Sequence, residues 1–409
     1  MVWKETCAVD ERMRFVLAVA AGEEPVAALC RCFGISRRTG YKWLGRYEAA
    51  GVGGLVDHSR APLTHPRAVP AAVAERCLAV RRAHPSWGPV KVRAFLARRE
   101  AEVAWPAAST IGALFDGAGL TVKRRLRRRA PPSSAPFAAC GAANEVWTID
   151  FKGWFRTGDG ARCEPLTLSD AYSRYLLRCQ ALACCAEEQV WPVLAAALRE
   201  YGLPRALRSD NGPPFASTGA GGLSRLSVKV VKAGIVPERI RPGKPQENGR
   251  HERLHLTLKQ DTASPPAASL RRQRERFAAF QRLYNEERPH QALAHTPPAE
   301  HYAASPRRFD GVLRSPDYGD DHQVRRVRHN GEIRWHGSTV YINQALCGEP
   351  VGLVETADGG FSVHYGPVLL GRIAHGGTRL SRPLPPAGGP VDNAARCPQG
   401  PRPHQQQPT

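Results

Sequence analysis

Three carboxylates stand where a side chain is expected to do chemistry. Asp150 lies inside the β-rich run Val146–Phe151, where a buried carboxylate is costly unless it has a cation, hydrogen-bond donors or a function. Asp210 precedes an Asn-Gly turn at the end of a predicted strand, where side chains of an α/β sheet project into an open cleft. Glu252 lies in the first turn of a predicted helix. One such acid carries little information, but the three together suggest a metal site.

Carboxylate oxygens are hard ligands, and three of them suit Mg²⁺ or Mn²⁺. Two such ions about 3.5–4 Å apart activate an attacking oxygen and stabilise the leaving oxygen in an in-line displacement at phosphorus. No histidine base is needed, because the metal lowers the pKa of the nucleophile. We therefore predict that Asp150, Asp210 and Glu252 are catalytic residues and metal ligands, with two Mg²⁺ or Mn²⁺ ions as cofactor.

Glu252 follows a segment, residues 242–249, whose prolines and glycines interrupt regular structure. Glu252, His255 and Lys259 are spaced at i, i+3 and i+7, so they share one face of the predicted helix. Beyond a flexible loop, the acid could hold a metal ion and the two basic groups could hold an anionic backbone. Lys244, His255 and Lys259 are therefore predicted DNA contacts. The alternative is an ordinary solvated helix face.

The scaffold that must position these acids reads as a mixed α/β layer. A meander of three strands comes first, followed by alternating strand and helix. The predicted strands and helices cover residues 146–151, 166–169, 175–181, 187–201 and 205–210, and a long helix covers 269–288.

The first fifty residues predict three short helices, 12–21, 25–32 and a third from the capping residue Ser36 to Tyr47. Helix, Gly-containing turn and helix is the spacing of a helix-turn-helix. The third helix then reads DNA, and its predicted contacts are Arg37, Arg38, Tyr41 and Lys42. The alternative is a small helical bundle with a basic surface.

A second helical unit is predicted from helices at 72–84, 90–100 and 109–118, with Trp87 packed at the corner between the first two. A basic run follows, and we expect it to contact phosphates rather than serve as a solvated linker. Its cations are Lys123, Arg124, Arg125, Arg127, Arg128 and Arg129. The formal net charge of +21 over 409 residues also favours a polyanionic partner, first of all double-stranded DNA.

Beyond residue 306 the pattern turns to closely spaced short strands, 323–327, 331–335, 338–342, 350–355, 360–365 and 367–373, which predict a small barrel or sandwich. The predicted domains are two helix-turn-helix units at 8–62 and 63–122, a basic linker at 123–142, the α/β core at 143–305, an all-β domain at 320–382 and a disordered tail at 383–409. No apolar stretch approaches the ~20 residues of a membrane span, and the charged N-terminus lacks a signal core, so we expect a cytoplasmic, nucleoid-associated protein.

Three stretches, 147–151, 209–215 and 243–252, resemble the motifs of the integrase-core DDE transposases of bacterial insertion sequences, relatives of the retroviral integrases. Lys259 and the segment Asn285–His290 resemble the family's downstream helix and its Asn-x-x-Arg-Pro-His signature. The resemblance covers roughly residues 147–302. It implies a ribonuclease-H-like core whose DDE acids are Asp150, Asp210 and Glu252. Glu247 is excluded as the third acid, because the family's glutamate follows the glycine of the motif by three positions, and Glu247 precedes Gly249.

The chain departs from the retroviral branch in two respects. Helix-turn-helix units replace the His/Cys zinc module before the core, and the Asp–Glu spacing is longer, with the extra length expected at Gly219–Gly222. The resemblance implies a transposase that cuts the element's ends and joins the 3′-OH to target DNA, acting at synapsis as a dimer or larger oligomer. The β domain would bind DNA or a partner subunit. The alternatives are a structure-directed nuclease and a catalytically silent DNA-binding regulator or decayed copy.

Three further groups have structural interpretations. Cys163, Cys179, Cys184 and Cys185 are expected to be small buried hydrophobes, because no C-x-x-C pair occurs among the 11 cysteines. Asp170 is expected to pair locally with Arg174. Asn211 is expected to form the turn rather than orient a metal-bound water.

Overall fold

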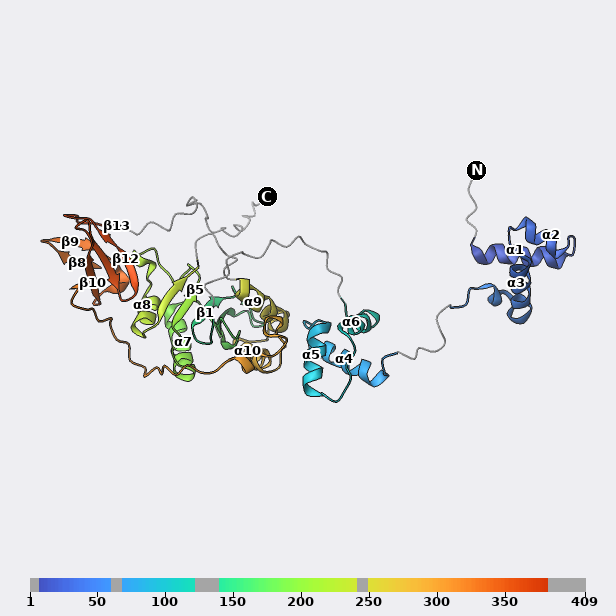
Figure 1. Ribbon diagram of the computed structural model, residues 1–409, viewed down its shortest axis with the longest axis horizontal. Coiled ribbons are helices and arrows are strands. Elements are labelled where there is room, and N and C mark those ends of the chain that lie inside the picture. Colours follow the sequence, from blue (N-terminus) through green and yellow to red (C-terminus); the bar gives the residue numbers. More distant parts are fainter. Residues whose placement is uncertain (1–6, 60–67, 122–139, 241–248, 382–409) are drawn as a thin grey trace, which may run out of the picture. The chain divides into compact units, whose positions relative to one another are not determined.

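The computed structural model describes residues 7–59, 68–121, 140–240 and 249–381. The chain divides into two compact units, residues 1–69 and 70–409 (Figure 1). Among the described residues, no helix is both long enough and apolar enough to cross a membrane. The predicted tail, 383–409, lies outside the described residues.

The first unit contains the three predicted helices and one short turn of helix. These are α1 (Ala8–Ala21), α2 (Val26–Cys32), α3 (Arg37–Ala50) and η1 (Gly51–Leu55). Ser36 caps α3 as predicted, its hydroxyl accepting the Thr39 N–H at 3.1 Å. Gly40 lets α3 pack closely, because a Cβ there would lie 2.6 Å from Sγ of Cys30. The helix-turn-helix packing therefore depends on a residue without a side chain.

The second unit begins with α4 (Ala71–Ala83), α5 (Pro89–Arg99) and α6 (Ala108–Gly117), which confirm the three predicted helices. Trp87 is fully buried at their corner, as predicted. Its ring stacks on His84 at 4.1 Å between centroids and meets Phe95 edge-on at 5.2 Å.

The central sheet of the second unit runs in the order β4-β3-β1-β5-β6, and β2 pairs with the start of β3. Strands β3 and β4 are antiparallel, β1 is antiparallel to β3, and β5 and β6 run parallel to β1. This confirms the predicted meander followed by strand–helix alternation. The strands are β1 (Val146–Phe151), β2 (Phe155–Arg156), β3 (Arg162–Asp170), β4 (Leu176–Leu182), β5 (Ala206–Ser209) and β6 (Val236–Arg239).

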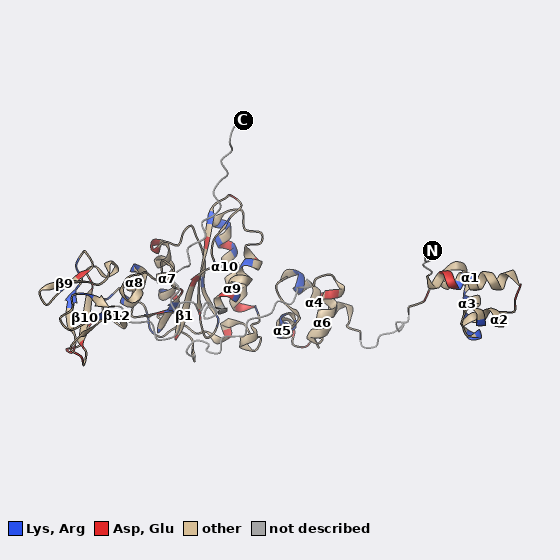
Figure 2. Cartoon of the chain, turned by 90° about the horizontal axis from the view of Figure 1, so that it is seen from above, with Lys and Arg blue, Asp and Glu red and all other residues tan. Residues whose placement is uncertain are grey.

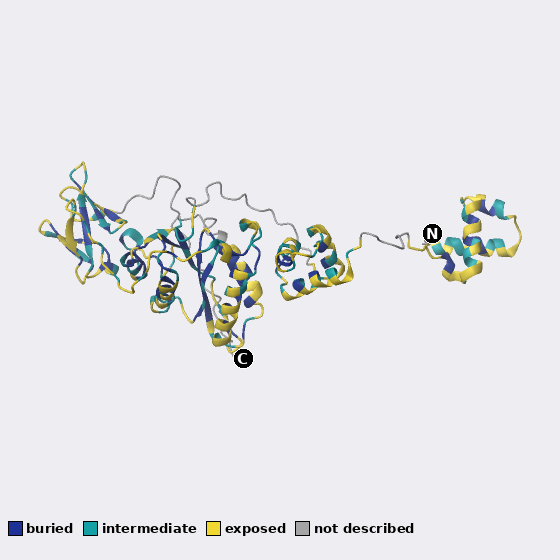
Figure 3. Ribbon diagram, turned by 60° about the horizontal axis from the view of Figure 1, so that its bottom comes forward, coloured by how far each residue is buried: buried dark blue, intermediate teal, exposed yellow. Residues whose placement is uncertain are grey.

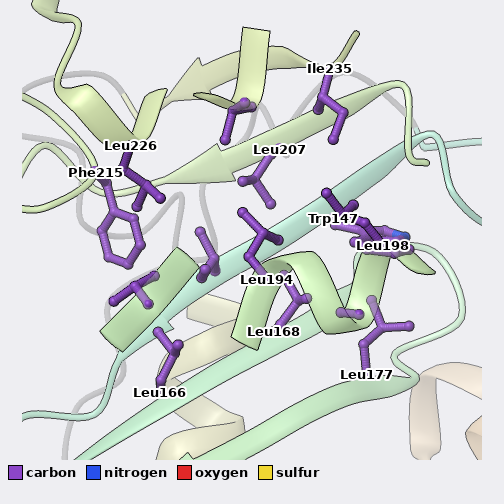
Figure 4. Packing of buried hydrophobic residues seen from close by; sticks show 14 of the residues in the cluster. Trp147, Leu166, Leu168, Leu177, Leu194, Leu198, Leu207, Phe215, Leu226 and Ile235 are labelled. Carbon is purple, nitrogen blue, oxygen red and sulfur yellow. The ribbon is translucent and has the colours of Figure 1, made fainter. Parts of the chain in front are cut away.

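Two pairs of helices pack on this sheet through different hydrophobic clusters. Helices α7 (Glu187–Tyr201) and α8 (Arg225–Lys232) pack on Leu166, Leu168 and Leu207 (Figure 4). Helices α9 (Gly249–Thr262) and α10 (Leu270–Glu286) pack on Cys163 and Cys179. Figure 3 shows the strands buried between helices whose outer faces are exposed. The short turns η2 (Ala220–Gly222), η4 (Gln291–Leu293) and η5 (Pro298–His301) complete this part.

The C-terminal region contains the six predicted strands and one that the sequence pattern missed. They are β7 (Gln323–Arg326), β8 (Glu332–Trp335), β9 (Ser338–Tyr341), β10 (Pro350–Glu355), β11 (Phe361–Tyr365), β12 (Val368–Ile373) and the additional β13 (Leu380–Ser381), with a short turn η6 (Gln344–Leu346). The prediction was a small barrel or sandwich, and a closed barrel is not shown among the described strands. They make an open five-stranded sheet, β13-β12-β11-β10-β7, and a separate β8-β9 hairpin. Part of their apolar surface is covered by the core through α8.

Candidate active site and nucleic-acid interface

Parallel pairing of β1 with β5 sets Asp150, on β1, and Asp210, directly after β5, at the same end of two neighbouring strands. Thr148 pairs with Arg208, and each acid lies two residues further in the same direction. Neighbouring strands lie about 4.7–4.9 Å apart, and opposite positions share a face of the sheet. The Asp150 side chain is 14% exposed, and Asp210 is half-buried. Two of the three predicted acids therefore lie at the same end of two neighbouring parallel strands.

A tight turn fixes the surroundings of Asp210. The Gly212 N–H donates to Oδ1 of Asp210 at 3.2 Å, and a Cβ on Gly212 would lie 3.1 Å from Oδ2. Burial raises the pKa of Asp210, and the Gly212 hydrogen bond opposes this rise. The Asn211 amide donates to the Ile240 carbonyl at 2.8 Å. Asn211 thus supports the turn, which agrees with the simpler of its two interpretations.

Asp150 is linked to α9 through Thr167 and His255. Thr167 pairs with Asp150 in the sheet, and its hydroxyl donates to the Asp150 carbonyl at 3.2 Å. Nε2 of His255 hydrogen-bonds to Oγ1 of Thr167 at 2.8 Å. Nδ1 of His255 lies 4.0 Å from Oδ2 of Asp150. His255 therefore positions the helix that carries Glu252 against the strand that carries Asp150.

Glu252, His255 and Lys259 were predicted to share one face of the helix, but His255 is buried whereas the other two are exposed. His255 is only 6% exposed, because α9 turns its Leu254–His255–Leu258 stripe towards the sheet. Burial lowers the pKa of His255 to about 2, so the ring is neutral at physiological pH. A buried neutral ring is a poor contact for a phosphate. Glu252 and Lys259 are exposed, as the prediction requires.

Glu252 is not gathered with the two aspartates in the described structure. Within the described ranges, no group of three or more His, Cys, Asp or Glu side chains is close enough to hold a metal ion. The donor set still fits Mg²⁺ or Mn²⁺, because two adjacent carboxylates offer hard oxygen ligands. Lys244 and Glu247 lie outside the described residues, as does most of the predicted loop 242–249.

The predicted DNA contacts of the first unit lie together at the start of α3. Arg37, Arg38, Tyr41 and Lys42 are all exposed, Tyr41 to 61%. Figure 2 shows Lys and Arg residues in blue on α3. An exposed tyrosine among cations is suited to a DNA surface rather than to a core. The predicted basic arm from Lys123 to Arg129 lies outside the described residues.

A second basic and aromatic surface follows β1 and was not predicted. Trp154 is 55% exposed, and the guanidinium groups of Arg162 and Arg156 lie 4.9 and 5.8 Å from its ring centroid. Arg156 pairs directly opposite Arg162, and like charges in this position are destabilising. Glu164 neutralises part of this charge by pairing with Arg162 at 2.5 Å. The signal in the sequence was a tryptophan flanked by basic residues immediately beyond Asp150.

The Asn-x-x-Arg-Pro-His segment is structural in its described contacts. The Asn285 side chain pairs with β4, accepting the Leu176 N–H at 2.8 Å and donating to the Leu176 carbonyl at 2.9 Å. Arg288, 6% exposed, donates to Thr257 of α9 at 3.4 Å and to Ser86 at 3.3 Å. The segment therefore joins α9, α10 and β4, and it contacts the turn between α4 and α5.

The remaining structural predictions have mixed outcomes. Cys163 and Cys179 are buried, which raises the pKa of both thiols, whereas Cys184 is exposed and Cys185 is half-buried. The latter two lie in a bend before α7 rather than on a packed strand. Asp170 is buried and accepts hydrogen bonds from the Asn144 N–H at 2.8 Å and the Ser173 hydroxyl at 2.6 Å, so it stabilises a turn.

Helix-turn-helix units, together with a mixed sheet that sets two aspartates at one end of neighbouring strands, define a protein of the integrase-core class. Residues 233–298 match the integrase core domain family. Residues 11–62 match a helix-turn-helix domain family, and residues 39–115 match a homeodomain-like domain family.

Two curated proteins of insertion elements are similar to this chain. A 31.7 kDa protein of insertion element IS407 from Burkholderia multivorans is 31% identical over 196 residues, which are 47% of this chain and 68% of that protein. A 39.2 kDa protein of IS476 from Xanthomonas euvesicatoria is 28% identical over 196 residues, 47% of this chain and 54% of that protein. The chain belongs to the integrase-core transposases of bacterial insertion sequences.

Among solved structures, the catalytic core domain of the HTLV-2 integrase in complex with magnesium matches 40% of this chain and 99% of its own. The sequence identity of that match is 14% and its TM-score is 0.32. A simian T-cell lymphotropic virus intasome in complex with the PP2A regulatory subunit B56 gamma matches 71% of this chain and 91% of its own, at 14% identity and a TM-score of 0.35.

Proposed function

We propose that this protein is a DNA transposase that cleaves the ends of its element and joins them to target DNA. The observation that supports the proposal is that Asp150, on β1, and Asp210, directly after β5, lie at the same end of two parallel strands. Glu252, exposed in the first turn of α9, completes the proposed acid set.

Asp150, Asp210 and Glu252 would hold one or two Mg²⁺ or Mn²⁺ ions through their carboxylate oxygens. When bound, the ions would activate the attacking oxygen and stabilise the leaving one. In the first reaction, water attacks the phosphorus at the element's end, and the P–O3′ bond breaks to leave a 3′-OH. In the second, that 3′-OH attacks a target phosphorus and releases a target 3′-OH. Neither step forms a covalent bond to the enzyme.

The other described residues would bind and orient the DNA. Arg37, Arg38, Tyr41 and Lys42 on α3 would read the element's terminal repeats. Lys259 would bind a phosphate near the scissile bond, and Lys244 and the basic run from Lys123 to Arg129 would bind others. Trp154, with Arg156 and Arg162, offers a further surface for a DNA strand. Two ends brought together require at least a dimer, acting on the chromosome in the cytoplasm.

A strand-transfer assay distinguishes this proposal from its rivals. Linear DNA carrying the element's ends is incubated with a supercoiled target, Mg²⁺ and either wild type or Asp150→Asn. A transposase gives 3′-end cleavage and joined products, and Asp150→Asn gives neither while binding the ends normally. Cleavage without joined products would indicate a nuclease. Binding without cleavage by the wild type would indicate a regulator and would overturn the proposal.

A further inference from the structure

The C-terminal sheet and the catalytic core share one hydrophobic cluster. Helix α8 is buried on two sides: Leu226 and Val230 pack in the core cluster, and Val228 and Val231 pack against the C-terminal strands. Lys232 at the end of α8 pairs with Glu349 at 2.6 Å, and Glu349 also accepts hydrogen bonds from Ser315 and Tyr365. The two parts are therefore packed as a continuous structure.

The same interface fixes the glycine-rich turn before α8. Asn343, 4% exposed, donates to the Ala220 and Leu223 carbonyls at 3.2 and 3.1 Å. A Cβ on Gly219 would lie 2.5 Å from the Asn343 amide. Gly221, at φ +63°, faces Leu370 of β12, where a Cβ would lie 2.8 Å from the leucine side chain. The C-terminal strands thus form one wall of this turn.

Arg239 holds the other side of the turn. Its guanidinium donates to the Gly221 carbonyl at 2.8 Å, and Gly222, at φ +64°, leaves no room for a side chain beside it. Burial of this guanidinium lowers the pKa of Arg239. A cavity lined by Gly222, Arg239 and Ser209 lies at this point.

Arg239 is also close to Asp210, the proposed catalytic aspartate, through strand pairing. It ends β6 and pairs in the sheet with Ser209, the residue before Asp210. The next residue, Ile240, donates its N–H to the Ser209 carbonyl at 3.2 Å and accepts the Asn211 amide. Hydrogen bonds and strand pairing therefore connect Asn343, through the Gly219–Gly222 turn and Arg239, to the residues on either side of Asp210.

We propose that Arg239 and Asn343 are positioning residues, through which the C-terminal sheet fixes the Asp210 end of β5 for catalysis. The sheet is then part of the catalytic unit as well as any DNA-binding surface. This inference rests on the proposed function of Asp210. It also assigns a role to the Gly219–Gly222 turn, where the longer spacing between Asp210 and Glu252 was expected to lie.

The test compares Arg239→Gln with Arg326→Gln in the full-length protein. Both arginines donate to a backbone carbonyl. Arg326, on β7, donates to the Gly348 carbonyl at 2.8 Å, and β10 and β11 separate β7 from β12, the strand that contacts the turn. We expect Arg239→Gln to lower kcat for Mg²⁺-dependent cleavage about tenfold with unchanged KM for end DNA, and Arg326→Gln to match wild type. Equal kcat values for the two variants would overturn the inference.

A second measurement does not depend on activity. Hydrogen exchange of the peptide covering residues 206–223 should be faster in Arg239→Gln than in Arg326→Gln. Asn343→Ala should give the same increase, with Asn330→Ala, in an exposed turn of the same region, as its control. The double variant Arg239→Gln/Asn343→Ala should lose no more kcat than either single variant, since both act through one turn. Unchanged exchange would refute the link even if the protein proves not to be a transposase. Where cleavage is measured, additive losses of kcat would also refute it.

Discussion

Replacing Asp210 with Asn should stabilise the metal-free protein while abolishing its chemistry. Burial raises the pKa of Asp210 in the folded state, so the folded protein holds this proton more tightly than the unfolded chain does. The protonated Asp210 carboxyl stabilises the fold at low pH. This stabilisation is lost as the pH rises from the ordinary pKa of aspartate through the raised pKa of Asp210 in the folded protein. At pH 7 the ionised carboxylate is therefore destabilising, and Asn removes that charge.

The size of the gain follows from the surroundings of the carboxylate. Asn keeps an oxygen that can accept the Gly212 N–H, so no hydrogen bond to the turn is lost. Relieving one unfavourable charge commonly gains about 0.5–2 kcal/mol. Asp210 is only half-buried and keeps part of its hydration, which places the expected gain at the lower end of that range.

The assay is thermal and urea unfolding of wild type and Asp210→Asn, with and without Mg²⁺. Without metal, the variant should be the more stable at pH 7, and the difference should shrink as the pH falls towards 4. With Mg²⁺ at about 100 times its Kd, the wild type should gain about 2.7 kcal/mol and the variant little, which reverses the order. A variant that is less stable without metal, or equally stabilised by Mg²⁺, would refute the assignment of Asp210 as a buried metal ligand.

Three other results are expected. Thr167→Val should leave Nε2 of His255 without a partner in a buried place and lower the free energy of unfolding by about 1–3 kcal/mol, and an unchanged urea midpoint would contradict this. Gly212→Ala should crowd Asp210 and reduce Mg²⁺-dependent cleavage while end binding in a gel-shift assay stays normal, whereas full cleavage would contradict the turn's role. The logarithm of the affinity for DNA should fall linearly with the logarithm of salt concentration, with a slope of about −0.9 per phosphate contacted, and a flat response would exclude a broad basic interface.

Local sequence signals predicted most of the elements, because those signals agree with the packing. The helix at Glu187–Tyr201 and the strand at Pro350–Glu355 match their predicted bounds. The sequence predicted the all-β composition of the C-terminal region but not whether its sheet closes, because strand spacing does not specify closure. The described sheets are open, and α8 covers part of their apolar surface.

The sequence indicated less about the geometry of the proposed site than about the fold. Parallel pairing of β1 with β5 accounts for the positions of Asp150 and Asp210, whose assignment as metal ligands stays a prediction. The burial of His255 was not predicted, because i, i+3, i+7 spacing defines a helix face without specifying whether that face is buried, and its partner Thr167 lies far away in sequence. Arg239 and Asn343 act through long-range contacts with backbone carbonyls, which leave no local pattern.

The central claim is that Glu252, rather than its neighbour Glu247, joins the two aspartates in catalysis. The most direct test is 3′-end cleavage and strand transfer by Glu252→Gln and Glu247→Gln, two isosteric variants five positions apart, on the same end DNA with Mg²⁺. We predict that Glu252→Gln binds the ends but yields neither cleaved nor joined DNA, while Glu247→Gln retains both activities. Wild-type cleavage by Glu252→Gln would contradict the account.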